Sequence, residues 1–290
     1  MATVDLHMHS IISGDADYTV EQLLEFALRA DLQTIAITDH NKVGSVNEAI
    51  RVFTPHGIKV IPGIEIDCSF KGLNIHVLGY QIDISDPIFE QFGRDYHEQD
   101  KIVTWQMVDK LAEIFGIEFD YALLRDHAKD GVIIPEDVAE IIIHDSRYRH
   151  MNWLKPYLPG GLRADNPYVN FYWDMMAQDR VAHVGMNLPD VKEVIGHIQR
   201  TGGIAVIAHP GNNFKSKWDL FVELLDQTNL DGIEVCSSYH SEAQTMQFYE
   251  EAKKRNLLMT CGSDFHGKNK PSIKMGGISF YGLSETEFYR

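Results

Sequence analysis

The sequence predicts an α/β protein, a parallel sheet or barrel whose order of strands and helices is interrupted by a mainly helical insertion. Short apolar runs rich in β-branched residues alternate with longer amphipathic stretches, which is the pattern of a parallel α/β fold. This alternation stops in the middle of the chain and then resumes. The length of 290 residues, with 44% hydrophobic residues, fits one large barrel or two modest domains.

Seven runs carry the strand pattern, and all of them are short and rich in β-branched or apolar residues. They are residues 3–7, 34–38, 59–65, 74–79, 204–208, 232–236 and 258–262. Three stretches between them have apolar residues at helical spacing and are predicted as helices: residues 19–29, 191–200 and 243–255. Thr19 is the expected N-cap of the first helix and Asn256 the expected C-cap of the last.

The middle of the chain has a different character. Residues 87–115 have the pattern of one long helix, and from 116 to 185 the strand and helix rhythm is lost. This second stretch is interrupted by prolines and glycines and contains clustered aromatic residues at 168–173. We therefore expect a barrel formed by residues 1–115 and 186–290 and an inserted helical subdomain formed by residues 116–185.

The composition excludes several classes of protein. There are 26 Lys and Arg residues against 42 Asp and Glu residues, which gives a formal charge of −16. Such a surface repels phosphate backbones and anionic lipids, so we expect no docking to long nucleic acid or to membranes. The chain also contains 14 histidines. Histidines and carboxylates together are the raw material of cation sites.

The chain shows no sign of export. The first residues, MATVDLHMHS, lack the basic and apolar regions of a secretory signal, and no run approaches 18 apolar residues. The three cysteines, Cys68, Cys236 and Cys261, are widely spaced and are interpreted as small core residues. We expect a reduced, cytoplasmic chain.

Potential metal ligands recur at or near the ends of the predicted strands. They are His7 and His9, Asp39 and His40, Glu65, His76, His209, the segment 237–240, and Asp264 with His266. In a parallel barrel the carboxyl ends of the strands share one face, which is the face that carries active sites. His7 and His9 are two residues apart on an extended chain and so point the same way. The joint pattern predicts a metal cluster, whereas a lone histidine elsewhere in the chain is interpreted as a core or surface residue.

Six motifs, in order, carry a family resemblance. Asp-Leu-His-x-His-Ser, Thr-Asp-His, Gly-Ile-Glu, His-Val-Leu-Gly-Tyr, Ala-His-Pro-Gly and Gly-Ser-Asp-x-His resemble the polymerase and histidinol phosphatase (PHP) domain over residues 1–83 and 190–290. The resemblance implies a distorted (β/α)₇ TIM-like barrel that holds up to three divalent metal ions and hydrolyses phosphoesters. Nitrogen and oxygen ligands without thiolate favour Mn²⁺, Fe²⁺ or Zn²⁺. The insertion resembles that of a subgroup acting on nucleoside 5′-phosphates and 3′,5′-bisphosphates.

The metal ligands that the resemblance implies are His7, His9, Asp15, His40, Glu65, His76, His209, Asp264 and His266. Relatives carry an Asp five residues after the second His, where this chain has Gly14, so Asp15 is assigned with a one-residue insertion and Asp17 is the alternative. Glu65 would bridge two metals. Each cation needs about four to six coordination bonds, and these residues supply fewer than three cations require. Water, hydroxide or substrate oxygens must fill the remaining positions, as in an open catalytic cluster.

The implied reaction is hydrolysis of a phosphate monoester by hydroxide held between two metals at a trinuclear site. The substrate would be a small molecule, above all a nucleotide of the AMP or 3′,5′-bisphosphonucleotide type. A histidinol-phosphate-type phosphatase and a non-catalytic metal-binding accessory module are the alternatives. The insertion argues against the first, and the complete ligand set argues against the second.

Other residues of the site are less specific in pattern. Asp39 could orient an imidazole or a water molecule, or could cap the following turn. His240 could contact phosphate or protonate the leaving group. Where relatives often place an arginine after His-Pro-Gly, this chain has asparagines, so phosphate anchoring is assigned to basic residues elsewhere. The candidates are Lys155, Arg163, Lys215 and Lys217, and the inserted subdomain is expected to cap the substrate.

Overall fold

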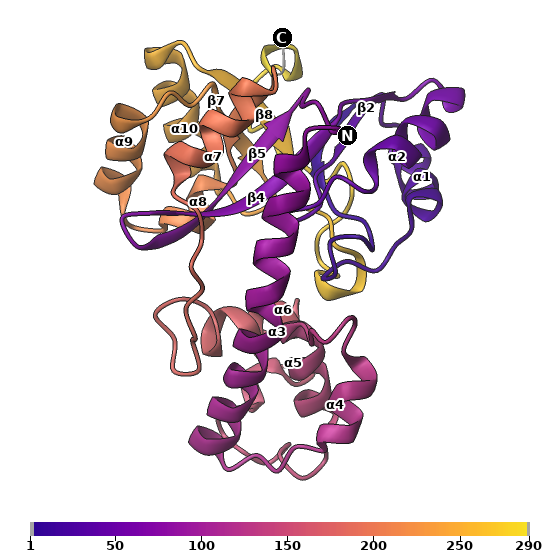
Figure 1. The fold of residues 1–290 in the computed structure, drawn as a ribbon, viewed down its shortest axis with the longest axis vertical. Helices are drawn as coiled ribbons and strands as arrows, with labels where there is room; N and C mark the ends of the chain where they lie inside the picture. The colour runs from indigo at the N-terminus through magenta and orange to yellow at the C-terminus, as the bar shows by residue number, and fades with distance from the viewer. Residues whose placement is uncertain (1–2, 289–290) are drawn as a thin grey trace. The chain divides into compact units, whose positions relative to one another are not determined.

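The computed structural model describes residues 3–288. Their contacts divide into two compact units, termed here the sheet unit and the helical unit. The sheet unit comprises Met1–Gly93, Leu188–His266 and Ile273–Arg290, and the helical unit comprises Arg94–Asn187 and Gly267–Ser272. The first boundary falls within α3 (Pro87–Phe115), which has the bounds predicted for the long helix (Figure 1). All the residues predicted as metal ligands belong to the sheet unit.

The strands of the sheet unit form two sheets. The three-stranded sheet is parallel and contains β1 (Val4–Met8), β2 (Thr34–Ile37) and β3 (Lys59–Val60). The five-stranded sheet contains, in order, β4 (Gly63–Phe70), β5 (Leu73–Tyr80), β6 (Ile204–Ile207), β7 (Gly232–Ser237) and β8 (Leu258–Gly262). The mixed α/β class is therefore confirmed. The wholly parallel arrangement is wrong, because β5 runs antiparallel to both β4 and β6.

A tight hairpin explains the antiparallel pair. Lys71 and Gly72 connect β4 to β5 and have φ angles of 50° and 77°. Two consecutive residues with positive φ are typical of a type I′ turn, whose twist matches that of the strands it joins. A parallel connection would need a crossover of a dozen or more residues. The pair Lys-Gly between two apolar runs was the sequence signal for this hairpin.

The predicted strand at residues 59–65 is two strands. β3 ends at Val60 and β4 begins at Gly63, with Ile61 and Pro62 between them. Proline has no N–H to donate to a ladder, so it ends the pairing of β3 with β2. The chain then continues into the second sheet. As a result Glu65 lies near the start of β4 and not at the end of a strand.

Two isolated bridges join the two sheets. His40, which follows the central strand β2, pairs with Glu65 of β4, and Met8 of β1 pairs with Phe265, which follows β8. A small apolar cluster between the sheets takes residues from both, among them Leu6 of β1 and Leu78 of β5. These contacts bring the ends of β1, β2, β6 and β8 to one region. Closure into a seven-stranded barrel stays a prediction.

Helices cover the outer faces of the sheets. They are α1 (Val20–Arg29) and α2 (Val46–Phe53) near β2, and α7 (Val191–Arg200), α9 (Trp218–Gln227) and α10 (Glu242–Arg255) against the five-stranded sheet (Figure 1). Thr19 caps α1 through a capping box with Gln22, as its position predicted. Asn256 ends α10 in the left-handed conformation, also as predicted. No helix within residues 3–288 is long and apolar enough to cross a membrane.

The helical unit is built from the second part of α3 together with α4 (Tyr121–His127), α5 (Pro135–His144) and α6 (Pro167–Met175). It has its own apolar core, which includes Leu111, Ile142 and Phe171. Phe171 is fully buried and contacts the ring of Tyr157. This part of the aromatic cluster therefore packs within the unit.

Candidate metal centre

Histidines and carboxylates from both sheets converge at one place in the sheet unit. Three groups of side chains each present ligand atoms within 4.8 Å of one another. The groups are His9, Asp15, His40 and His266; His7, His9, Glu65 and Asp264; and Glu65, His76 and His209. The structure thus brings together every residue that was predicted as a ligand. Their function as ligands stays a prediction.

The backbone places these residues in two ways. His7 and His9 lie at the end of β1, and His209 and Asp264 follow β6 and β8, as expected for carboxyl ends of parallel strands. Glu65 and His76 do not follow this rule, because β4 and β5 form a hairpin. Glu65 forms a parallel bridge with His40, which follows β2. This bridge places the start of β4 beside the end of β2 and brings Glu65 to the face that carries the other ligands.

A glycine allows the close approach of β1 and β8. A Cβ atom on Gly262 would lie 2.1 Å from the Cβ atom of His7 and 2.6 Å from an oxygen of Glu234. Real Cβ contacts are never this short, so a larger residue would push β8 away from His7. Gly262 therefore helps to set the position of the first histidine of the cluster.

The carboxylate of Glu65 is at the centre. It is fully buried, and five imidazoles face it: His7, His9 and His40 at 3.1, 3.1 and 3.5 Å from Oε2, and His76 and His209 at 3.0 and 3.1 Å from Oε1. Burial alone would raise the pKa of Glu65. The surrounding imidazoles, His7 first, outweigh burial and hold that pKa well below its usual range. Glu65 is the residue that joins the second and third groups.

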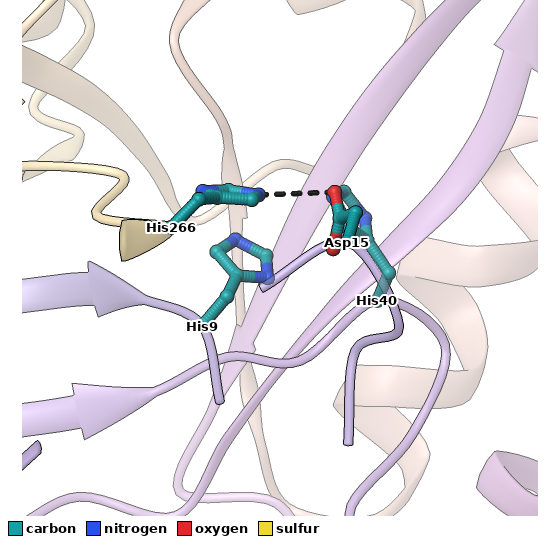
Figure 2. A group of neighbouring side chains, drawn as sticks. All are labelled: His9, Asp15, His40 and His266. Atoms are coloured by element: carbon teal, nitrogen blue, oxygen red, sulfur yellow. Dashed lines mark ion pairs between the residues drawn. The ribbon is translucent and has the colours of Figure 1, made fainter. Parts of the chain in front are cut away.

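Asp15 completes the first group. Its Oδ2 lies 3.1 Å from Nε2 of His266 and 3.6 Å from Nε2 of His40 (Figure 2). The preceding residue, Gly14, has a φ of 97°, which places the loop in a conformation that favours glycine. Asp15, and not Asp17, belongs to the group of neighbouring ligand atoms among the described residues.

The donor set fits a cluster of divalent cations. His7 Nδ1 contacts Glu234 Oε1 at 2.9 Å, and His266 Nδ1 contacts the Asp264 carbonyl oxygen at 2.9 Å. In a neutral ring the single hydrogen then lies on Nδ1, and Nε2 presents a lone pair. These lone pairs face carboxylate oxygens of Glu65 and Asp15, each 3.1 Å away. Two acceptors at this distance need a cation or a proton between them, and nitrogen with oxygen ligation suits Mn²⁺, Fe²⁺ or Zn²⁺.

Glu234 is a functional candidate that the sequence reasoning missed. It is fully buried on β7; its Oε1 contacts His7 Nδ1, and its Oε2 accepts the backbone N–H of His209 at 2.6 Å. A carboxylate that holds the outer nitrogen of a metal-binding histidine fixes the tautomer and the direction of the ring. The signal was present in the sequence, because a glutamate inside the apolar run 232–236 must find a partner when buried.

Asp67 is a second missed residue. It lies on β4 two positions after Glu65 and forms a further group of neighbouring ligand atoms with His40 and His76. Burial would raise the pKa of Asp67, but His76 and His40 outweigh it and lower that pKa far below the usual value. Residues two apart on a strand lie on the same face, so the spacing of Glu65 and Asp67 was the sequence signal that Asp67 faces the cluster.

Asp39 is fully buried and acts on the backbone around the cluster. Its carboxylate accepts hydrogen bonds from the N–H and hydroxyl of Ser10 at 2.7 and 2.8 Å and from the hydroxyl of Ser45 at 2.5 Å. Ser45 precedes α2, so Asp39 ties the loop after β1 to the start of this helix. This geometry is nearer to the capping interpretation than to a contact with an imidazole.

His240 is also held within the protein. Its Nδ1 donates to the Val235 carbonyl oxygen at 2.8 Å, and its Nε2 accepts the N–H of Gly211 at 3.1 Å. Burial lowers the pKa of His240 to about 4, which keeps the ring neutral. A role as proton donor or phosphate contact would break one of these bonds and stays a prediction. Its neighbour Tyr239, which was not predicted, donates to Asp264 Oδ2 at 2.5 Å.

The basic residues predicted to anchor phosphate are distributed over both units. Lys215 is exposed and follows α8 (Pro210–Phe214) in the sheet unit. Lys155 and Arg163 lie in the helical unit, where Lys155 donates to Asn152 and Arg163 pairs with Asp174 at 2.9 Å. Their contact with substrate stays a prediction.

Comparison with known proteins finds relatives that cleave phosphoric esters. The chain is 27% identical to a 3′,5′-nucleoside bisphosphate phosphatase of Chromobacterium violaceum, over 95% of this chain and 91% of that protein. It is 26% identical to a phosphoribosyl 1,2-cyclic phosphate 1,2-diphosphodiesterase of Eggerthella lenta, over 91% and 94% of the two chains. It is 27% identical to a 5′-3′ exoribonuclease of Escherichia coli, over 94% and 87%.

The fold has a solved counterpart. The structure of an amidohydrolase from Chromobacterium violaceum superposes with a TM-score of 0.76 at 24% identity, covering 96% of this chain and 91% of that one. The predicted class of enzyme, a hydrolase of phosphoric esters, is confirmed by the relatives. The model of the PHP domain matches residues 5–274, and this chain belongs to the PHP domain family.

Proposed function

We propose that this protein is a metal-dependent phosphatase that hydrolyses a phosphate monoester of a small nucleotide, of the AMP or 3′,5′-bisphosphonucleotide type. The observation that carries the proposal is the convergence of five imidazoles on the buried carboxylate of Glu65. Its two oxygens face separate groups of histidines, as a residue shared by two cations would. The bisphosphate phosphatase among the relatives supports this substrate class.

We assign one ion to each of three of the four groups of ligand atoms. When bound, divalent cations neutralise phosphoryl oxygens and lower the pKa of a coordinated water. Asp264, His7 and His9 would hold the first ion, His76 and His209 the second, and Asp15, His40 and His266 the third. Glu65 joins the first two, and Glu234 keeps the ring of His7 turned towards them. Mn²⁺, Fe²⁺ and Zn²⁺ all suit these donors.

Substrate would reach the cluster from its exposed side. The side chains of Asp15, His40, Asp67 and His76 are 25%, 18%, 13% and 22% exposed and are termed the rim. His7 and Glu65, by contrast, are fully buried. Lys215 in the sheet unit and Lys155 and Arg163 in the helical unit are proposed phosphate anchors, the helical unit acting as a cap.

The charge of −16 favours a small substrate over a long polyanion. The exoribonuclease among the relatives makes stepwise hydrolysis of short RNA the second candidate. Buried free thiols at Cys68, Cys236 and Cys261 accord with the proposed cytoplasmic location, where thiols stay reduced.

A phosphate-release screen tests the proposal. The purified protein is loaded with Mn²⁺ and assayed for inorganic phosphate released from AMP, 3′,5′-bisphosphoadenosine and histidinol phosphate, and for mononucleotides released from short oligoribonucleotides. We expect the highest kcat/KM on one of the two nucleotides. Preference for oligoribonucleotides would show that the protein is an exonuclease. Preference for histidinol phosphate would show that it is a histidinol-phosphate-type phosphatase. Release from none of them by metal-loaded protein would contradict phosphatase activity and favour an accessory module.

A further inference from the structure

Asp67 faces two histidines of the cluster at once. It lies directly opposite His76 in the register of the β4–β5 hairpin, and its Oδ1 is 3.1 Å from His76 Nε2. Its Oδ2 is 3.4 Å from Nδ1 of His40, and this nitrogen also lies 3.5 Å from Glu65 Oε2. Each of these rings turns its other nitrogen to a predicted ligand carboxylate. His76 Nδ1 is 3.0 Å from Glu65, and His40 Nε2 is 3.6 Å from Asp15.

We propose that Asp67 is a positioning residue that holds the outer ring nitrogens of both His40 and His76 and thereby aims their inner nitrogens at the metal ions. The inference rests on the proposed function. A neutral imidazole carries one hydrogen, and a carboxylate stabilises it on the nitrogen that it faces. The opposite nitrogen then presents its lone pair towards Glu65 or Asp15.

A second residue fixes the direction of the Asp67 carboxylate. Asn41 donates its amide Nδ2 to Asp67 Oδ2 at 2.6 Å and accepts the backbone N–H of Asp67 at 3.1 Å. Asn41 is buried and directly follows His40, with a φ of 54°. The same short segment therefore supplies one histidine and the brace for the carboxylate that orients it.

An additional ion held by Asp67, His40 and His76 is the competing interpretation of this geometry. In that case both nitrogens of His40 and both nitrogens of His76 would bind a cation. A neutral imidazole carries one N–H hydrogen, so each ring would have to lose that hydrogen. One carboxylate that serves two ions through two neutral rings needs no such deprotonation.

Equilibrium binding of Mn²⁺ to the metal-stripped full chain tests the inference. For Asp67→Asn we expect about 10- to 100-fold weaker binding of two ions, those held through His40 and His76, with the third ion unchanged. Circular dichroism of the metal-free variant should show the fold of the wild type. Asp83→Asn is the matched control, because this exposed carboxylate of the same unit contacts Ser85. It should bind Mn²⁺ as the wild type does.

Two results would overturn the inference. One is unchanged Mn²⁺ affinity in Asp67→Asn, and the other is the loss of a single ion while the remaining ions bind as before, which would make Asp67 a ligand of its own site. Asn41→Gly provides a second variant if Asp67→Asn fails to fold, because glycine accepts the positive φ while removing both contacts to Asp67. It should weaken the same two ions.

The proposed function is tested separately by the wild type. If the wild type binds Mn²⁺ and releases phosphate while Asp67→Asn binds as tightly, the positioning role fails and the function stands. A wild type that binds no Mn²⁺ would contradict both.

Discussion

The cluster has an inner wall and a rim that are built differently. The inner wall, defined as His7, Glu65, His209 and Glu234, is at most 4% exposed, whereas the rim residues are 13% to 25% exposed. Inner-wall side chains contact one another, so each fixes its neighbour. The rim holds its histidines through Asp67 and Asp15 at the edge of solvent. We therefore expect changes to the inner wall to weaken the two ions that Glu65 joins and to have larger effects than changes to the rim.

The largest effect is expected from Glu65→Gln. The variant removes the charge that faces five imidazoles while keeping the shape of the side chain. Phosphate release should fall by about 10³-fold or more, since the charge that holds two ions is lost. Mn²⁺ stoichiometry should fall with it, and circular dichroism should show a retained fold. A variant that keeps wild-type activity would contradict the central position of Glu65.

Glu234→Gln tests whether the inner wall acts through orientation. Glutamine keeps the size of the side chain but cannot accept both the ring hydrogen of His7 and the N–H of His209 on charged oxygens. Mn²⁺ affinity should fall by about 10- to 100-fold, as expected for a partner of a ligating histidine. Glu223→Gln is the control, because this glutamate on α9 pairs with Lys71 and belongs to none of the groups of ligand atoms. Equal affinities in the two variants would assign Glu234 to packing alone.

A smaller effect is expected at the rim. Asp15→Asn should weaken one ion, which His40 and His266 would still hold, and reduce phosphate release by about 10-fold. Asp17→Asn should leave both measurements unchanged. The reverse result, with Asp15→Asn silent and Asp17→Asn inactive, would show that the ninth ligand is Asp17 and that the loop rearranges when metal binds.

The sequence was sufficient to predict the candidate metal ligands. It was insufficient to predict Glu234 and Asp67, the carboxylates that contact the outer nitrogens of the histidines. His7, His9 and Asp264 stand in short motifs at strand ends, where residue type and position together indicate a cation site. Glu234 and Asp67 stand inside strands, and their partners His7 and His76 are distant or belong to the next strand. Such pairing depends on sheet register, which one sequence does not encode in any local pattern.

The same reason explains the errors in topology. The expectation that each ligand ends a parallel strand held for β1, β2, β6 and β8. The helices α1, α7 and α10 lie where periodicity predicted them, whereas α2 and α9 were not predicted. It failed at the hairpin of β4 and β5, where Lys71 and Gly72 set the direction of the return strand. His76 reaches the cluster because an antiparallel neighbour carries it back past Asp67.

The smallest effect concerns the pH dependence of the metal-free protein. Burial alone would lower the pKa of His40, but the carboxylates of Glu65 and Asp15 outweigh it and raise that pKa to about 9. Because the folded state binds this proton more tightly than the unfolded state, the stabilisation is full below about pH 6.5 and is lost as pH rises to about 9. The expected loss in the free energy of unfolding is about 1 to 3 kcal/mol.

Melting of the chelated protein between pH 6 and pH 10, in buffers of constant ionic strength, measures this loss. His40→Gln should flatten the profile, whereas His56→Gln, at an exposed position, should not. Added Mn²⁺ should remove the dependence in the wild type, because a cation takes the place of the proton between imidazole and carboxylate. A profile that falls as steeply in His40→Gln would assign the titration to His7 or His76, which have raised pKa values too. The proton-linked stability would then belong to His7 of the inner wall or to His76 of the rim.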